Sequence, residues 1–315
     1  MSKFMRFLPS RRRIGVWLRS HQLVPPKAAR FRVLLADLHG DDDAGTQTRH
    51  LETALSDQPG ITIMPVGEAL RIADGEIDCA ALEQCRALIA GHNGDSLMFG
   101  EVLPRAPRIR IRLVGRYEQE AGRHGPYQMD WTELPKHFGP DVEGLLLALT
   151  ALSVSPAAQS DQDRACLVNL LRPAATKLTR LLEQPSQALD GERQGVFWHA
   201  LGIAASLLGE YTQSQRWPEV AVHAHRTALL IWQQETVVFP WAMLQNNLGH
   251  ALRLLAVQQS DRQQHLVLLQ QAIEAFQEAL RVYRAAAAAD FYRRQTETNL
   301  AHAEALLAAR PIAAE

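Results

Sequence analysis

Three consecutive aspartates follow the first apolar stretch of the chain, and they are the first candidates for metal chemistry. Asp41, Asp42 and Asp43 carry the carboxylate oxygens that Mg²⁺ prefers, and His39 and His50 flank them. A metal ion bound there would allow a nucleotide to bind, since the carboxylates alone would repel its phosphates. The alternative is a solvated loop with one carboxylate near a helix N-terminus, where the helix dipole favours negative charge. We favour this alternative and predict no metal site and no cofactor.

Nucleophilic catalysis is the second candidate chemistry. Gly94-Asp95-Ser96-Leu97 spells the serine block of a lipase-like hydrolase family, whose base comes from a distant Asp-x-x-His. The chain contains no Asp-x-x-His, and a serine without a base is a poor nucleophile. Phosphate loops, dinucleotide-binding glycines, nucleophile elbows and HExxH motifs are absent as well. Cys79, Cys85 and Cys166 lack the CxxC spacing of a zinc cluster and cannot form a disulfide framework. We therefore predict that the protein is not an enzyme.

Arginine alternates with apolar residues from Arg108 to Val114, which raises the question of nucleic acid binding. Aromatic side chains that could stack on bases are not interleaved with these arginines. The whole chain has 33 Lys and Arg against 34 Asp and Glu, so an overall basic footprint is missing. We predict a solvated sheet face here, and no nucleic acid partner.

Residues 1–30 form a basic leader, because they carry eight Lys or Arg and no Asp or Glu. Ile14–Leu18 is shorter than the roughly 7–15 apolar residues of a signal peptide. The leader is either a disordered or docked tail or an interfacial anchor on anionic lipid. In the second case the contacts with the membrane or another anionic surface would come from Arg11, Arg12, Arg13, Trp17 and Arg19.

Polar residues in the second half of the chain are candidates for binding a partner. They are Asn246, Asn247, His250, Arg253, Asn299 and His302. If Leu248 and Gly249 face the packed side of a helix, these side chains lie on its remaining faces and on those of the next hairpin. The alternative is that the asparagines cap and cross-link neighbouring helices by hydrogen bonds.

The elements that position these residues change character along the chain. Residues 31–155 alternate short apolar strands with helices, which predicts an α/β domain with a small mixed sheet of about five strands. The expected strands are 31–38, 61–66, 96–103 and 108–114, with a return strand that contains Tyr127, Met129 and Trp131. Residues 156–189 are expected to be a linker and a connecting helix.

Residues 190–315 carry a diverged helical repeat and predict an all-α array of helical hairpins. Leu201-Gly202, Leu248-Gly249 and Leu300-Ala301 recur at separations of 47 and 52 residues. A second helix follows the first two of these pairs, with small residues around one larger side chain: Ala221, His225 and Ala228, then Ala272, Phe276 and Ala279. The glycine would let the paired helix approach closely. A longer connection, Gln258–Gln264, is expected between the two helices of the second hairpin.

These residues resemble the tetratricopeptide repeat, whose first helix carries a Leu-Gly pair and whose second carries an Ala-aromatic-Ala pattern. Members of that family often bind extended peptides, and some hold a carboxylate with asparagine, lysine and arginine. Asn247 and Asn299 match the asparagine, whereas the lysines are missing. Residues 31–155 resemble the amino-terminal domain of TolB and related envelope proteins, in FRVLLADLHGDD, ITIMPVG and DSLMFGEVL. That resemblance implies a small α/β layer that docks other proteins.

We expect a non-catalytic adaptor that binds a protein or peptide partner through its helical repeats. A membrane-surface assembly factor held by the basic leader is the first alternative. A metal- or nucleotide-dependent regulator that uses the Asp41–Asp43 loop is the second. The expected location is cytoplasmic, with peripheral contact to the inner membrane as a variant. A short array leaves partly apolar end faces, so a homo-oligomer is also compatible with the sequence.

Overall fold

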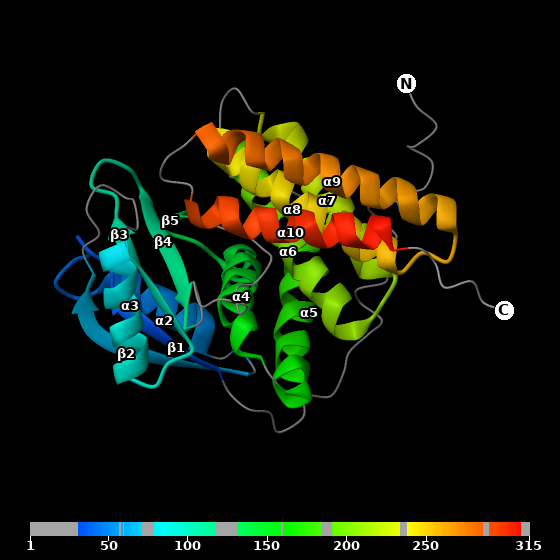
Figure 1. Ribbon diagram of the computed structural model, residues 1–315. Coiled ribbons are helices and arrows are strands. Elements are labelled where there is room, and N and C mark those ends of the chain that lie inside the picture. Colours follow the sequence, from blue (N-terminus) through cyan, green and yellow to red (C-terminus); the bar gives the residue numbers. More distant parts are fainter. Residues whose placement is uncertain are drawn as a thin grey trace. The chain divides into compact units, whose positions relative to one another are not determined.

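The computed structural model describes residues 31–56, 58, 60–70, 79–116, 131–158, 160–183, 191–233, 238–285 and 290–309 (Figure 1). These residues form two compact units, one up to residue 183 and one from residue 191 onward. The basic leader, with Arg11, Arg12, Arg13, Trp17 and Arg19, lies outside the described residues. So does most of the return strand expected around Tyr127 and Met129.

The first unit contains a five-stranded mixed sheet with the order β2-β1-β3-β4-β5, as predicted. The strands are β1 (Phe31–Asp37), β2 (Ile61–Ala69), β3 (Ser96–Val102), β4 (Arg108–Gly115) and β5 (Thr132–Pro135). β1 pairs parallel with β2 and β3, whereas β3–β4 and β4–β5 are antiparallel. Residues 33–36 of β1 are a continuous apolar run because the strand is buried on both faces there, as in other central parallel strands.

Four helices complete this unit: α2 (Thr46–Ser56), α3 (Cys79–Gly91), α4 (Pro140–Val154) and α5 (Asp161–Glu183). α3 covers one face of the sheet, where Leu34, Leu97 and Phe99 form a core with Ile89. α2 and α4 pack against other side chains of the sheet and against each other. The stretch 156–189, expected to be a linker and a connecting helix, holds a short 3₁₀ turn (Ser155–Ala157) and α5, which packs against α4 within this unit.

The second unit is an array of five helices, which confirms the predicted all-α region. They are α6 (Gly191–Thr212), α7 (Arg216–Ile231), α8 (Val238–Val257), α9 (Arg262–Ala285) and α10 (Asp290–Ala308). α6 pairs with α7 and α8 pairs with α9, while α8 also packs against α6 and α10 (Figure 1). The connection between α8 and α9 is shorter than expected, because Asp261 accepts hydrogen bonds from the backbone of Gln263 and Gln264 and starts α9 early.

The two hairpins repeat one close approach between their helices, as the Leu-Gly pairs predicted. A Cβ built on Gly202 would lie 2.4 Å from Cε1 of His225, and one on Gly249 would lie 2.7 Å from Cε1 of Phe276. Both rings are completely buried. Only glycine leaves room for a ring at these distances, so the repeat is a property of the packing as well as of the sequence.

Candidate functional site

A chain of buried hydrogen bonds crosses α6, α8 and α10, and we call it the polar ladder. It consists of His199, Asn246, Asn247, Thr296 and Asn299. Nδ2 of Asn247 lies 2.6 Å from Nε2 of His199, and Nδ2 of Asn246 donates to Oδ1 of Asn247 at 3.1 Å. Oδ1 of Asn246 accepts from Oγ1 of Thr296 at 3.1 Å and from Nδ2 of Asn299 at 3.0 Å. The ladder therefore joins three helices that are far apart in sequence.

The two adjacent asparagines of α8 are what allow the ladder to reach both neighbouring helices. Successive residues of an α-helix point about 100° apart around its axis, at 3.6 residues per turn. Asn247 bonds to α6 and Asn246 to α10, so one dipeptide spans the interval between two helices. Asn246 and Asn247 are both fully buried, and each remains hydrogen-bonded, as a buried amide must be.

A second polar contact links α6 to α8 nearer the surface. Nε2 of His250 lies 2.8 Å from Oε1 of Glu210, and Nη2 of Arg253 lies 3.1 Å from Nδ1 of His250. Since arginine can only donate, Nδ1 accepts and Nε2–H donates to the carboxylate, which fixes the neutral tautomer. Burial lowers the pKa of His250 below its usual value, and the hydrogen bond to Glu210 opposes that shift.

The histidines next to the ladder are held in their neutral form by burial. His199 accepts from Asn247, and burial lowers its pKa to about 3. His225 of α7 lies with its ring centroid 5.5 Å from that of His199. Its pKa is well below the usual value, mainly because of burial and then because of repulsion from His199 and His250. Neutral imidazoles in a dry interior suit packing and hydrogen bonding rather than proton transfer to a substrate.

The structure corrects where most of the predicted partner-binding residues lie. Asn246, Asn247 and His250 are at most 1% exposed, and Asn299 is 9% exposed, so the expectation that they face outward is wrong. The reason is that α6 and α10 pack on either side of α8 and convert its polar face into an interface. The alternative, in which the asparagines cross-link helices, describes the observed bonds. Arg253 is half-buried, and His302 is exposed on α10.

Three members of the buried cluster were not singled out as site residues from the sequence: His199, Glu210 and Thr296, which lies on α10. His199 and Glu210 lie on α6 and supply the partners of Asn247 and His250. The signal was available for His199, which precedes Asn247 by 48 residues in a repeat whose Leu-Gly pairs are 47 residues apart. No comparable signal marked Glu210, because a single glutamate near a helix end is ordinary.

The aspartate loop between β1 and α2 serves as the cap of that helix. Oδ2 of Asp41 accepts from the backbone of Gln47 at 3.1 Å and from the backbone and hydroxyl of Thr48 at 2.9 Å. Asp42 accepts from the backbone of Thr46, and this hydrogen bond lowers its pKa. The favoured interpretation of a carboxylate at a helix N-terminus therefore fits the geometry. Within the described residues, no cluster of three metal-ligating side chains occurs.

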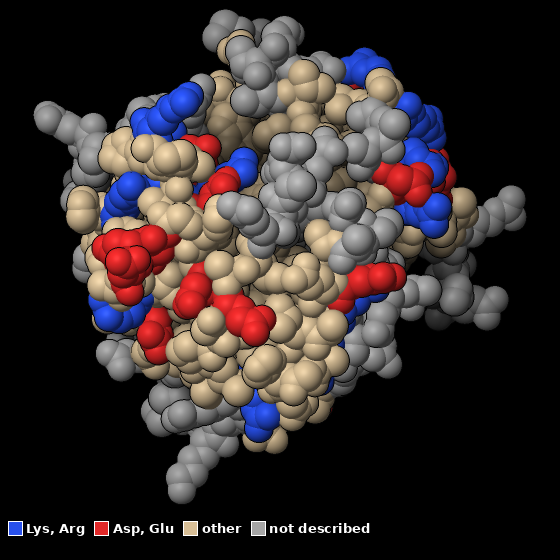
Figure 2. All heavy atoms as spheres, turned by 90° about the vertical axis from the view of Figure 1, so that its left-hand side faces the viewer, with Lys and Arg blue, Asp and Glu red and all other residues tan. Residues whose placement is uncertain are grey.

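The arginine face of β4 is engaged in contacts across the sheet. Arg108 pairs with Glu133 at 3.0 Å, and Arg110 pairs with Glu101 and lies 4.8 Å from the centroid of the Trp131 ring. The register places these side chains on one face, since Glu101 is opposite Arg110 and Glu133 is opposite it on β5. On the face of the molecule drawn in Figure 2, the acidic and basic side chains of the described residues are interspersed. This arrangement agrees with a solvated sheet face.

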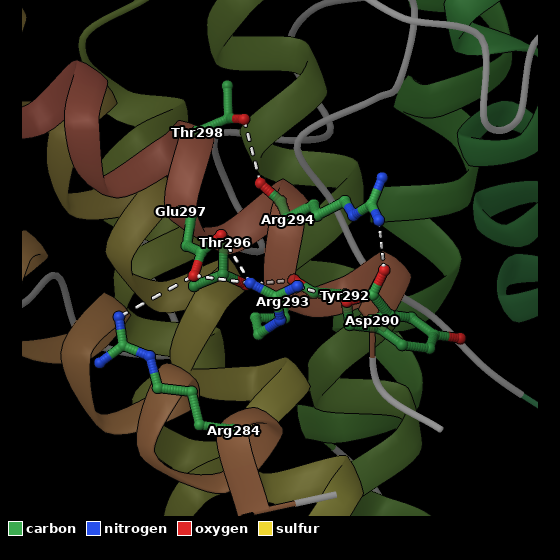
Figure 3. A network of polar contacts seen from close by, with 8 residues as sticks. All are labelled: Arg284, Asp290, Tyr292, Arg293, Arg294, Thr296, Glu297 and Thr298. Carbon is green, nitrogen blue, oxygen red and sulfur yellow. Dashed lines mark hydrogen bonds and ion pairs between the residues drawn. The ribbon is translucent and has the colours of Figure 1, made fainter. Parts of the chain in front are cut away.

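Charged side chains form a network at the start of α10, and one of its members contacts the end of α9 (Figure 3). Arg293 pairs with Asp290 and, at 3.1 Å, with Glu297, which lies 3.9 Å from Arg284 of α9. Arg294 pairs with the same Asp290 at 2.8 Å. Each exposed pair contributes little, about 0–1 kcal/mol, and of these pairs only Arg284–Glu297 joins α9 to α10, while the others lie within α10.

The outer side of α10 carries a strip of exposed side chains among the described residues, and we call it the α10 open face. It consists of Ala301, Glu304, Ala305 and Ala308, which are all exposed. Through the 52-residue spacing, Ala301 aligns with Gly249 and Glu304 with Leu252 of α8. Gly249 and Leu252 are buried, Gly249 beneath Phe276 of α9. The same helical position is therefore covered in one hairpin and uncovered in the next.

Comparisons with known proteins yield no match to a family model, to a curated protein or to a solved structure. Among the described residues, no helix combines the length and the apolar character needed to cross a membrane. The chain is thus characterised by its own architecture: a five-stranded mixed sheet with its helices, followed by an array of packed helices.

Proposed function

We propose that the protein is a non-catalytic adaptor, in which a tetratricopeptide-like array follows a domain similar to the TolB amino-terminal domain, and that it binds a protein partner on the α10 open face. The observation that carries the proposal is the contrast between α8 and α10. Gly249 is covered by α9, whereas the aligned Ala301 is exposed.

The side chains of the open face suit a helical ligand. Ala301, Ala305 and Ala308 recur at spacings of four and three residues, so they lie along one side of α10. Small side chains permit close approach of another helix, as Gly249 does for α9. Glu304 and the exposed His302 border this strip and could fix the register of the ligand through polar contacts. Helix-in-groove recognition of this kind needs no catalytic group.

A capture experiment with matched variants tests this function. The full chain would be expressed in its native host, cross-linked, and compared with A301R/A305R and with the control Q270R/Q277R. Gln270 and Gln277 are exposed on the outer side of α9. Their replacement by arginine adds the same charge as A301R/A305R, but away from the open face. We expect one or more partners that are lost with A301R/A305R and retained with the control, with cross-links that map to α10.

The opposite pattern contradicts the proposal. If partners remain bound to A301R/A305R, or if their cross-links map to the first unit, the α10 open face is not the binding surface. Circular dichroism of both double variants must show unchanged helix content and thermal midpoint, so that a lost partner reports on the surface alone.

A further inference from the structure

Three imidazole rings meet inside the helical array, each from a different helix. His199 of α6, His225 of α7 and His250 of α8 are all at most 1% exposed. The rings of His199 and His225 are 5.5 Å apart in an edge-to-face arrangement. The indole ring of Trp232 also packs edge-to-face against His199, with the ring centroids 6.0 Å apart. The cluster lies where the α6–α7 hairpin packs against α8, so the protonation state of its histidines affects the packing of all three helices.

Of the three histidines, His225 has the fewest hydrogen bonds to offset the burial of its ring nitrogens. Nδ1 and Nε2 are both buried, and neither has a hydrogen-bond partner among the described residues. Its ring covers Gly202 in the way that Phe276 covers Gly249 in the next hairpin. Because phenylalanine performs this packing role one repeat later, packing alone does not require an imidazole. What the imidazole adds is a group that can take up a proton.

The titratable groups around His199 and His225 would do little to stabilise a protonated ring. The titratable groups that act on His225 are His199 from α6 and His250 from α8, both of the same type. Among the described residues, burial is what lowers the pKa of His199, whose Nε2 already receives a hydrogen from Asn247. His250 faces Glu210 from α6, Arg253 from its own helix and His302 from α10, so of the three rings it is the one with a carboxylate partner in the part of the chain that the structure describes. Protonation of His199 or His225 would leave a charge buried without a counterion, which is costly.

We propose that the buried histidines make the helical array acid-sensitive, so that proton uptake by His199 and His225 opens the packing of α6, α7 and α8. Protonated His199 could no longer accept from Asn247, so the first hydrogen bond of the polar ladder would have to break or reverse. The same event therefore weakens the packing of the hairpin and the link from α6 to α8. This inference concerns the fold of the array and does not depend on the proposed partner.

The direction of the pH effect follows from the two states. The unfolded chain binds these protons near the ordinary histidine pKa of about 6.5, whereas the folded array excludes them until the pH is far lower. Stability contributed by the neutral rings is therefore complete above pH 6.5 and is lost as the pH falls below it. For His199 this window extends down to about pH 3. Each such histidine raises the unfolding equilibrium constant about tenfold between pH 7.5 and pH 5.5.

The test measures urea unfolding of the full chain at pH 7.5 and pH 5.5, with hydrogen-exchange mass spectrometry to assign the transition to α6, α7 and α8. We expect the unfolding constant of the wild-type array to be about a hundredfold larger at pH 5.5, from His199 and His225 together. His225→Phe, which copies the residue of the next hairpin, should reduce that ratio about tenfold. His92→Gln, at an exposed position after α3, should leave the ratio unchanged.

Two results would overturn the inference. One is a wild-type ratio below about threefold, which is less than a single buried neutral histidine predicts. The other is a His225→Phe ratio equal to that of the wild type. If the variant does not fold at pH 7.5, the wild-type ratio decides the matter by itself.

Discussion

Substitution of Asn246 by alanine can distinguish whether the polar ladder stabilises the array or binds a partner. Asn246 is fully buried and makes three hydrogen bonds, one to Asn247 on its own helix and two to Thr296 and Asn299 of α10. A typical buried hydrogen bond contributes about 1 kcal/mol net, and the partner groups left buried without it add a desolvation cost. We therefore expect Asn246→Ala to lower the free energy of unfolding of the array by about 3–5 kcal/mol.

The assay is equilibrium urea unfolding followed by circular dichroism at pH 7.5, where the buried His199, His225 and His250 are neutral. Thr298→Ala provides the control, because Thr298 is exposed on α10 and its hydroxyl donates only to the carbonyl of Arg294 in its own helix. Exposed positions of this kind usually change stability by no more than about 0.5 kcal/mol. If Asn246→Ala lowers the free energy of unfolding by less than about 1 kcal/mol, the structural role assigned to the polar ladder is refuted. Loss of a captured partner at unchanged stability would instead support the original expectation that Asn246 contacts a ligand.

Two further substitutions test the packing and the cap. Gly249→Ala places a methyl group 2.7 Å from the Phe276 ring, and this overpacking should lower the free energy of unfolding by about 1–3 kcal/mol. The better helix propensity of alanine offsets about 1 kcal/mol of that loss, and urea unfolding measures the net change. Gly91→Ala has open space around it and should be neutral or stabilising in the same measurement. Asp41→Ala removes the acceptor for three groups at the start of α2 and should lower the thermal midpoint by an amount equivalent to about 1–2 kcal/mol, whereas Asp43→Ala should leave it unchanged.

The sequence predicted the elements well where one physical signal dominated. The alternation in Arg108–Val114 identified β4 and its half-buried face, since a strand with one wet face has a period of two. The Leu-Gly pairs identified the close helix approaches, because only glycine tolerates a ring against the helix backbone. The connection after α8 was predicted too long, because the capping role of Asp261 was not recognised.

The candidate site was harder to predict, because burial depends on what packs against a helix. The polar character of Asn246 and Asn247 suggested an outward face, yet their surroundings are set by partners on α6 and α10 that lie 48 and 53 residues away in sequence. A helix that is buried on most of its faces carries no clear amphipathic stripe, and α8 is of this kind. Local periodicity therefore cannot distinguish an asparagine on a groove from one between helices.

The polar ladder gives the array a property that apolar packing alone would not provide. Alanine and leucine rows tolerate a shift of one helix turn against the next, since one methyl group resembles another. The amides of Asn246 and Asn247 are satisfied only when His199 and Asn299 stand opposite them, and a shift of one turn, about 5.4 Å, would leave them buried without partners. The ladder thus selects one register of α6, α8 and α10. Because the α10 open face belongs to the same rigidly registered helix, the position of the proposed binding surface is fixed by hydrogen bonds inside the array rather than by contacts on the surface itself.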